Sequence, residues 1–151
     1  MHHVYGNSTQ FISPAMHKAL LALAEAATSP EATTEELTGL TITAGRLFRV
    51  PNPTSAQRAS LIRRAEHWAS LPVAERGIYS REEAPIGTRV SSCRLSGGLT
   101  GRVQRYCLPS ADQPDNEYGD HLYVVLDPGQ QAAAPGRWFS WGTLRPVTTT
   151  A

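Results

Sequence analysis

Apolar residues in the first half of the chain recur three or four positions apart, which is the spacing of amphipathic helices. The first such helix has Ser13 as its cap and Pro14 at its first position, where a missing amide hydrogen costs nothing. Its apolar face is formed by Met16, Leu20, Leu23, Ala24 and Ala27. The helix is predicted to end near residues 28–30.

A second helix is predicted to begin at Thr33, because Thr33 and Glu36 have the spacing of a capping box. Gly39 follows closely, so the sequence predicts a short helix and then a separate apolar stretch over residues 43–50. Pro51-Asn52-Pro53 ends that stretch and favours a tight turn.

A longer helix is predicted over residues 54–70, with Thr54 or Ser55 as its cap. At about 100° per residue, one arc is apolar and is formed by Leu61, Ile62, Ala65, Trp68 and Ala69. A second arc is polar and contains Gln57, Ser60, Arg63, Arg64 and His67. One face of this helix is therefore expected to pack and the other to face water.

From residue 86 onward, short runs of apolar residues are separated by turn residues, which is typical of strands. Five strands are predicted, over residues 87–93, 99–107, 121–126, 137–141 and 144–147. A polar loop over residues 108–120 joins the second strand to the third. Curling five such strands removes their exposed edges, so a partly closed barrel is expected.

The change from helical to strand patterns places a domain boundary at residues 80–85. We therefore predict an α+β chain with three parts: a flexible N-terminus over residues 1–10, a helical unit over residues 11–82 and a small β-barrel over residues 85–148.

Composition excludes several classes of protein. The chain has 151 residues, 18% of them charged, and a net charge of +1, which excludes a disordered chain and a globally basic nucleic-acid binder. No apolar run reaches the roughly 18–20 residues that span a bilayer, and no leader pattern opens the chain. We therefore expect a cytoplasmic protein with no membrane partner.

The polar arc of the helix over residues 54–70 has the side chains that bind DNA, because Arg binds guanine or phosphate, Gln binds adenine and Ser binds either. An ordinary solvated helix face accounts for the same residues, and residue types alone do not separate the two interpretations.

The stretch from Thr43 to Ala65, followed by Trp68 and Gly77-Ile78-Tyr79, resembles the short helix, turn and recognition helix of winged helix-turn-helix proteins. The resemblance covers roughly residues 12–82 and implies binding to double-stranded DNA. It implies that the DNA-binding residues are Ser55, Gln57, Arg58, Ser60, Arg63, Arg64 and His67, with Arg76, Tyr79 and Arg81 on a wing. The alternative is that this helical layer packs on the barrel or on a partner chain.

The strands after residue 85 resemble the Src homology 3-like barrel group over about residues 85–148. The resemblance is carried by Gly87 and Val90, by Gly101 and Val103, by the apolar run 123–126 and by Leu144-Arg145-Pro146. Barrels of this group bind peptides, nucleic acid or modified side chains, so the resemblance implies a fold and leaves the function open.

Aromatic residues are concentrated in the fourth predicted strand. Strand alternation places Trp138 and Ser140 on one face, and Phe139 and Trp141 on the other. One explanation of these aromatic residues is that their rings fill the interior of the small barrel and cover its ends. The functional alternative is a partner-binding surface of Arg102, Arg105, Arg137 and Trp138 that stacks on a peptide or on unpaired bases.

Catalytic and metal-binding patterns are weak. Cys93, Cys107 and His121 can meet on neighbouring strands, but the Cys-x-x-Cys and His-x-x-x-His spacings of structural zinc sites are absent from the sequence. The opening strands also look like those of plasmid-encoded dihydrofolate reductases, but the Val-Gln-Ile-Tyr strand of that family is replaced by residues 138–141. We expect no enzyme activity, metal or cofactor.

These features favour a non-enzymatic DNA-binding protein, a regulatory or accessory factor of a mobile element such as a phage or of a bacterial genome, which uses the helix over residues 54–70. The alternative is a protein–protein interaction adaptor that binds a partner protein through the barrel aromatics and the loop 108–120. The sequence leaves the oligomeric state open.

Overall fold

The computed structural model describes residues 12–92, 98–107, 121–131 and 134–147. The chain divides into two units, Met1–Leu71 and Pro72–Ala151. The first unit is helical and the second contains a five-stranded antiparallel sheet. The predicted α+β class, with helices first and strands second, is therefore confirmed. The predicted N-terminal segment 1–10 and the loop 108–120 lie outside the described residues.

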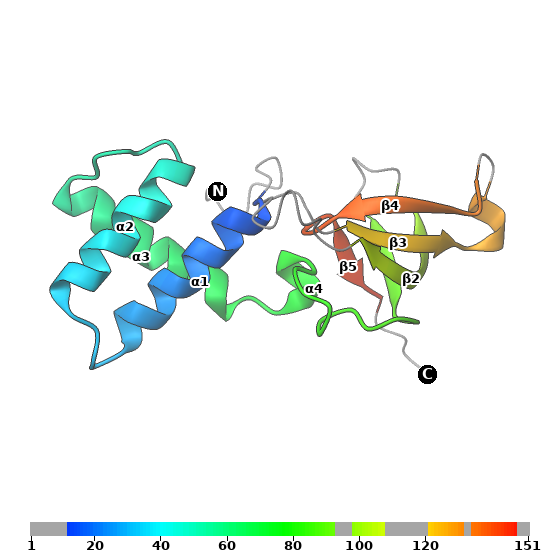
Figure 1. The fold of residues 1–151 in the computed structure, drawn as a ribbon, viewed down its shortest axis with the longest axis horizontal. Helices are drawn as coiled ribbons and strands as arrows, with labels where there is room; N and C mark the ends of the chain where they lie inside the picture. Colours follow the sequence, from blue (N-terminus) through cyan, green and yellow to red (C-terminus); the bar gives the residue numbers. More distant parts are fainter. Residues whose placement is uncertain (1–11, 93–97, 108–120, 132–133, 148–151) are drawn as a thin grey trace. The chain divides into compact units, whose positions relative to one another are not determined.

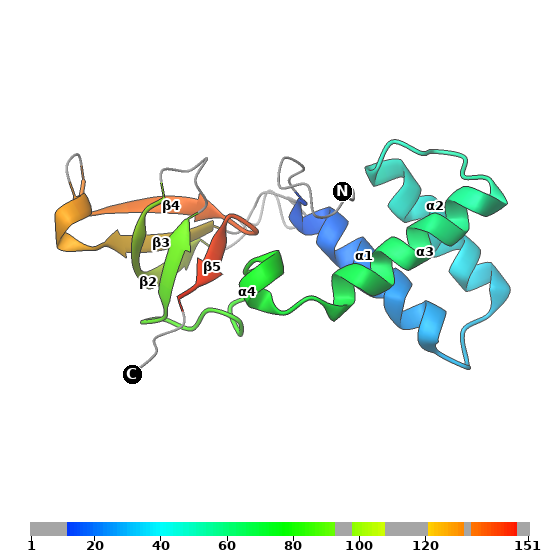
Figure 2. The ribbon, with the colours of Figure 1, turned by 180° about the vertical axis from the view of Figure 1, so that it is seen from behind.

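Over residues 12–71 the first unit contains three helices: α1 (Pro14–Thr28), α2 (Thr34–Leu47) and α3 (Ser55–Ser70). Seen from behind in Figure 2, α3 crosses α1 and α2, and all three pairs of helices are in contact. The inward-facing residues are small or apolar and are Leu20, Leu23, Ala24, Thr41, Ala44, Leu61, Ala65 and Trp68.

The helix starts follow the local chemistry of the sequence. The amide of Met16 donates to the Ser13 hydroxyl at 3.2 Å, which caps α1. Capping boxes begin α2, through Thr33 and Glu36, and α3, through Thr54 and Gln57. The predicted caps of these three helices are confirmed.

The prediction of a short second helix is wrong, because α2 continues through Gly39 and Gly45 to Leu47. Glycine inside a helix costs about 1 kcal/mol relative to alanine, and burial of the C-terminal half of α2 offsets this. Gly45 also has a packing role. The amide of Val50 donates to the Gly45 carbonyl at 2.6 Å. A Cβ at position 45 would collide with the carbonyl of Val50. The glycine lets the chain turn back directly after α2.

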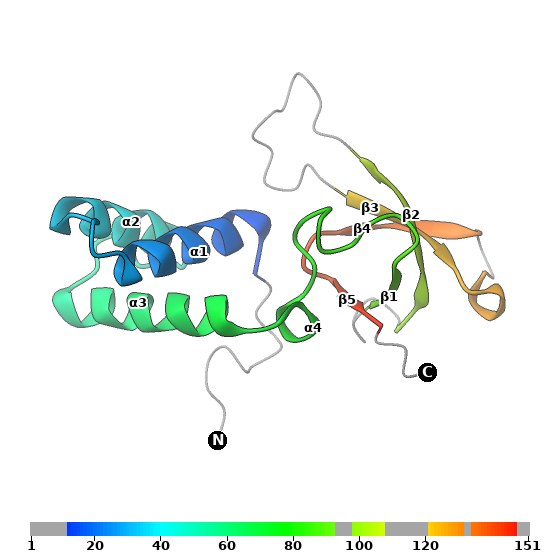
Figure 3. The same ribbon diagram turned by 90° about the horizontal axis from the view of Figure 1, so that it is seen from below.

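The sheet of the second unit has the strand order β4-β3-β2-β1-β5. Its strands are β1 (Arg89–Ser92), β2 (Thr100–Cys107), β3 (His121–Leu126), β4 (Gly136–Ser140) and β5 (Leu144–Pro146). These bounds lie within one or two residues of the predicted strands. Figure 3 shows β1 and β5 side by side, in agreement with their antiparallel pairing. Figure 1 shows the chain coloured by its position in the sequence, with the helices first and the strands after them.

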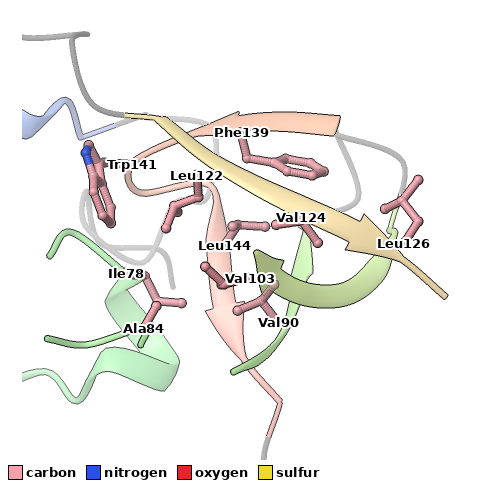
Figure 4. Close-up of a cluster of buried hydrophobic side chains, with 10 residues drawn as sticks. All are labelled: Ile78, Ala84, Val90, Val103, Leu122, Val124, Leu126, Phe139, Trp141 and Leu144. Atoms are coloured by element: carbon pink, nitrogen blue, oxygen red, sulfur yellow. The ribbon is translucent and has the colours of Figure 1, made fainter. Parts of the chain in front are cut away.

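Residues 72–84 belong to the second unit, so the division of the chain lies before the change in composition at residues 80–85. This segment contains the short helix α4 (Val73–Arg76). The amide of Ile78 donates to the Leu144 carbonyl at 3.0 Å, and both Ile78 and Ala84 are fully buried. Figure 4 shows these two side chains in one cluster with the inward-facing residues of the strands. Burial of apolar area thus ties the segment to the sheet.

Asp127, at the end of β3, connects three strands through its carboxylate. The guanidinium of Arg89 donates to both carboxylate oxygens, at 3.2 and 3.0 Å, and the Thr100 hydroxyl donates at 2.5 Å. The hydrogen bond from Thr100, followed by that from Arg89, lowers the pKa of Asp127 below its ordinary value of 3.8. These bonds favour the ionised carboxylate in the folded chain.

This lowered pKa predicts acid sensitivity of the second unit. In the unfolded chain Asp127 takes up a proton near pH 3.8, whereas in the folded chain it stays ionised to lower pH. Its contribution to stability is therefore complete above the unfolded pKa and is lost as the pH falls through the folded pKa. We expect the melting temperature of Asp127→Asn to decline less than that of the parent protein between about pH 4 and pH 2. Identical declines would contradict this role of Asp127.

Candidate functional site

The face of α3 that was expected to meet water is largely exposed. Gln57, Ser60, Arg63 and His67 are exposed, and Arg64 is half-buried. Leu61, Ala65 and Trp68 are buried on the other side. Two residues depart from the expected apolar arc: Ile62 is half-buried and Ala69 is exposed. The predicted division of α3 into two faces is confirmed, except that Ile62 and Ala69, at one edge of the apolar arc, are not buried.

Three of the predicted DNA-binding residues also hold the start of α3 in place. The Gln57 side chain accepts a hydrogen bond from the Thr54 amide at 2.9 Å. The guanidinium of Arg58 donates to the Pro53 carbonyl and to the Ser55 hydroxyl, each at 3.1 Å. These bonds fix the turn before α3. They also engage the side chains of Ser55, Gln57 and Arg58 with neighbouring groups of the protein itself.

Arg64 lies against the segment that joins α2 to α3. Its guanidinium carbon is 4.1 Å from the ring centroid of Phe48, which is cation–π geometry. This contact fixes the end of α2 relative to the middle of α3. Arg63, one position earlier, is exposed.

The five arginines of this unit lie between Glu36 and Glu66, in a stretch without acidic residues. Residues 37–65 contain Arg46, Arg49, Arg58, Arg63 and Arg64 but neither Asp nor Glu. The contact between Arg64 and Phe48 brings α3 next to the end of α2, where Arg46 and Arg49 are exposed. Sequence reasoning missed Arg46 and Arg49, although the absence of acidic residues from this stretch is a signal that identifies them. We call these five residues the arginine cluster.

Arg76 has a different environment from the one predicted for a wing. Its guanidinium pairs with the Glu83 carboxylate at 2.5 Å, and its side chain is only 10% exposed. Glu83 also accepts from the Tyr79 amide at 2.9 Å. Within residues 71–88, the described chain forms α4 and turns instead of a strand pair. Arg76 thus holds the segment between α4 and the sheet together.

Tyr79 and Arg81, the other predicted wing residues, also lie in the second unit. Tyr79 is half-buried, and this burial raises the pKa of its hydroxyl well above the ordinary value of 10. Arg81 is exposed, with its guanidinium carbon 5.4 Å from the Tyr106 ring centroid. Both side chains contact neighbours within their own unit.

A second cluster lies on the outer face of the sheet, where Arg105, Tyr123 and Trp138 form a row across β2, β3 and β4. Arg105 pairs with Tyr123, and Tyr123 pairs with Trp138. The Tyr123 and Trp138 ring centroids are 5.1 Å apart with the ring planes at 64°, an edge-to-face arrangement. The Arg105 guanidinium carbon is 4.5 Å from the Tyr123 centroid and 5.4 Å from that of Trp138. We call these three residues the sheet-face row.

Strand alternation explains why Trp138 is accessible. Trp138 is 45% exposed, whereas Phe139 and Trp141 are 5% and 4% exposed. The predicted opposite orientation of Trp138 and Phe139 is therefore confirmed. Gly136 lies under the Tyr123 ring, and a Cβ at position 136 would lie 2.6 Å from the ring. This glycine makes room for Tyr123 beside Trp138.

The four predicted partner-binding residues do not form one group. Arg105 and Trp138 meet in the sheet-face row, and Arg102 pairs with Val125 farther along the same face and donates to the Gly87 carbonyl at 2.9 Å. Arg137 pairs with Val124, which faces the core, and its guanidinium carbon is 5.4 Å from the Phe139 centroid. Alternation therefore separates Arg137 from its neighbour Trp138. Tyr123 was missed, because cross-strand pairing cannot be seen in the sequence.

The possible metal ligands Cys93, Cys107 and His121 have side chains outside the described part of the structure. Among the side chains that are described, no three His, Cys, Asp or Glu residues lie close enough to hold a metal ion. None of the described helices is both long and apolar enough to cross a bilayer.

Comparisons of the chain with protein-family models, with curated proteins and with solved structures find no match.

Proposed function

We propose that this chain is a non-enzymatic DNA-binding protein, a regulatory or accessory factor of a mobile element or a bacterial genome, which contacts double-stranded DNA through α3. The observation that carries the proposal is the arginine cluster: five arginines on the end of α2, the following turn and α3, with no acidic residue between positions 37 and 65. Such a local concentration attracts phosphate even though the net charge of the whole chain is only +1.

The arrangement of the helices supports a helix-turn-helix-like interpretation. α2 and α3 are in contact, and the turn between them is fixed by Gly45, by the Arg58 hydrogen bonds and by the stacking of Arg64 on Phe48. In this interpretation Ser60 and Arg63 face the groove, and Arg46 and Arg49 contact the backbone. Arg76 is left out, because Glu83 occupies its guanidinium.

The strand order of the second unit supports a Src homology 3-like barrel. β1 pairs with β2 on one side and with β5 on the other, so the last strand returns to the first. The bulge between Val103 and Arg105 bends β2, as a sheet that curls on itself requires.

The proposed DNA contact predicts a specific loss of affinity. We expect Arg46→Ala/Arg63→Ala to weaken binding to a mixed-sequence duplex by about tenfold or more. The slope of log affinity against log salt should fall by about two, because each of the two arginines neutralises about one phosphate. Fluorescence anisotropy between about 50 and 200 mM salt measures both quantities.

Arg81→Ala is the matched control, because Arg81 is exposed but lies in the second unit. It should leave duplex binding unchanged. A parent protein that does not bind duplex at low salt, or a double variant with an unchanged salt slope, would overturn the proposal.

A further inference from the structure

The outer face of β2, β3 and β4 is basic, because Arg102 and Arg105 lie on it and the carboxylate of Asp127, directly after β3, is paired with Arg89. The three strands have the sequences TGRVQRYC, HLYVVL and GRWFS, which contain neither Asp nor Glu. Arg102 and Arg105 share the outer face with Tyr123 and Trp138, because the cross-strand pairing places them there. The charge of this face complements a polyanion.

The hydrophobic part of this face is a single aromatic platform. Among the described residues, the exposed large hydrophobic side chains are Ile86 and Trp138, so Trp138 has Arg105 beside it and is not part of a wider apolar patch. Protein interfaces have a closely packed apolar centre around their aromatic residues. A single exposed indole beside a guanidinium group instead suits the flat face of a nucleobase with a phosphate next to it.

The contacts of the row hold this platform in a fixed orientation. The edge-to-face contact with Tyr123 limits rotation of the Trp138 ring. Arg105 lies against both rings and is exposed, so its guanidinium N–H groups can donate to a phosphate beside the platform. The platform and its phosphate donor are thus arranged before a ligand binds, which reduces the entropy cost of binding.

We propose that this face binds single-stranded nucleic acid, with Trp138 stacking on an unpaired base and with Arg105 and Arg102 contacting the adjacent phosphates. The proposal is independent of the α3 contact with duplex DNA, since the two sites share no residue.

The test uses the full chain and a fluorescent single-stranded oligothymidylate. We expect Trp138→Ala to weaken binding by about tenfold, because stacking of one base contributes roughly 1–3 kcal/mol, or about 5- to 150-fold. Trp138→Phe should retain most of the affinity. Arg105→Ala should also weaken binding, whereas Arg137→Ala, which removes an exposed arginine from the other side of the same strand pair, should not.

Several outcomes would overturn this proposal. One is a parent protein that does not bind the oligonucleotide at low salt, and another is binding that is insensitive to Trp138→Ala. Equal losses from Arg105→Ala and Arg137→Ala would indicate diffuse charge attraction without a defined site. If polyglutamate binds in a Trp138-dependent way and the oligonucleotide does not, the ligand of this face is an acidic protein segment. Arg46→Ala/Arg63→Ala separates the two proposals, because it should impair duplex binding and leave the Trp138-dependent binding of the single strand intact.

Discussion

Replacing Trp68 by alanine is expected to remove about 3–5 kcal/mol from the free energy of unfolding of the helical unit. Trp68 is only 8% exposed on the inner face of α3. Its indole N–H donates to Nδ1 of His17 on α1 at 3.0 Å, and the two rings meet edge-to-face with centroids 6.0 Å apart. Truncation leaves a cavity between α1 and α3 and removes this hydrogen bond. A loss of this size is a large part of the roughly 5–15 kcal/mol that stabilises a whole domain.

Thermal and urea unfolding followed by circular dichroism at the helical band measure this loss, which should appear as a fall in melting temperature of more than about 10 °C. Ala69→Ser is the matched control, because Ala69 is the exposed neighbour on the same helix, and it should change stability by less than about 0.5 kcal/mol. A cost below about 1 kcal/mol for Trp68→Ala would mean that α1 and α3 are held together by other contacts.

Replacing Phe139 by alanine is expected to cost the second unit about 3–5 kcal/mol as well. Phe139 is 5% exposed and pairs with the fully buried Leu122 on β3. Figure 4 shows its ring pointing into the cluster formed by the inward-facing residues of the sheet. Few residues of a small sheet bury as much apolar area as a phenylalanine.

The neighbouring substitution Trp138→Ala is the control for this prediction. It removes a larger side chain from the outer face, where the main loss is the edge-to-face packing against Tyr123, and should cost only about 1 kcal/mol. Urea unfolding followed by near-ultraviolet circular dichroism compares the two variants. Similar losses of stability would show that both rings support the core. The effect of Trp138→Ala on binding would then be a result of the lost stability.

Much of the fold could be predicted because its signals are local. Ser13, Thr33 and Thr54 cap their helices with bonds to residues three positions away, and such bonds depend on nearby sequence only. Strand alternation likewise predicted the opposite orientations of Trp138 and Phe139. The second helix was predicted too short because Gly39 carries a local cost, which packing between distant segments offsets.

The parts of the candidate sites that could not be predicted depend on contacts between segments. Arg76 was expected to be exposed, but the turn after α4 brings Glu83 to its guanidinium. Tyr123 was not distinguished from a core tyrosine, because its place beside Arg105 and Trp138 follows from the register of three strands. The proposed functions depend on these pairings, and the sequence alone does not specify strand register.

The pairing of β1 with β5 has a consequence for the order of folding. Each helix of the first unit contacts a helix that is near in sequence, so this unit can form as soon as α3 has been synthesised. Ser92, in contrast, pairs with Leu144, and closing so long a loop is slow. During translation β1 therefore has an open edge until β5 leaves the ribosome, and this interval is when the nascent chain is most exposed to aggregation.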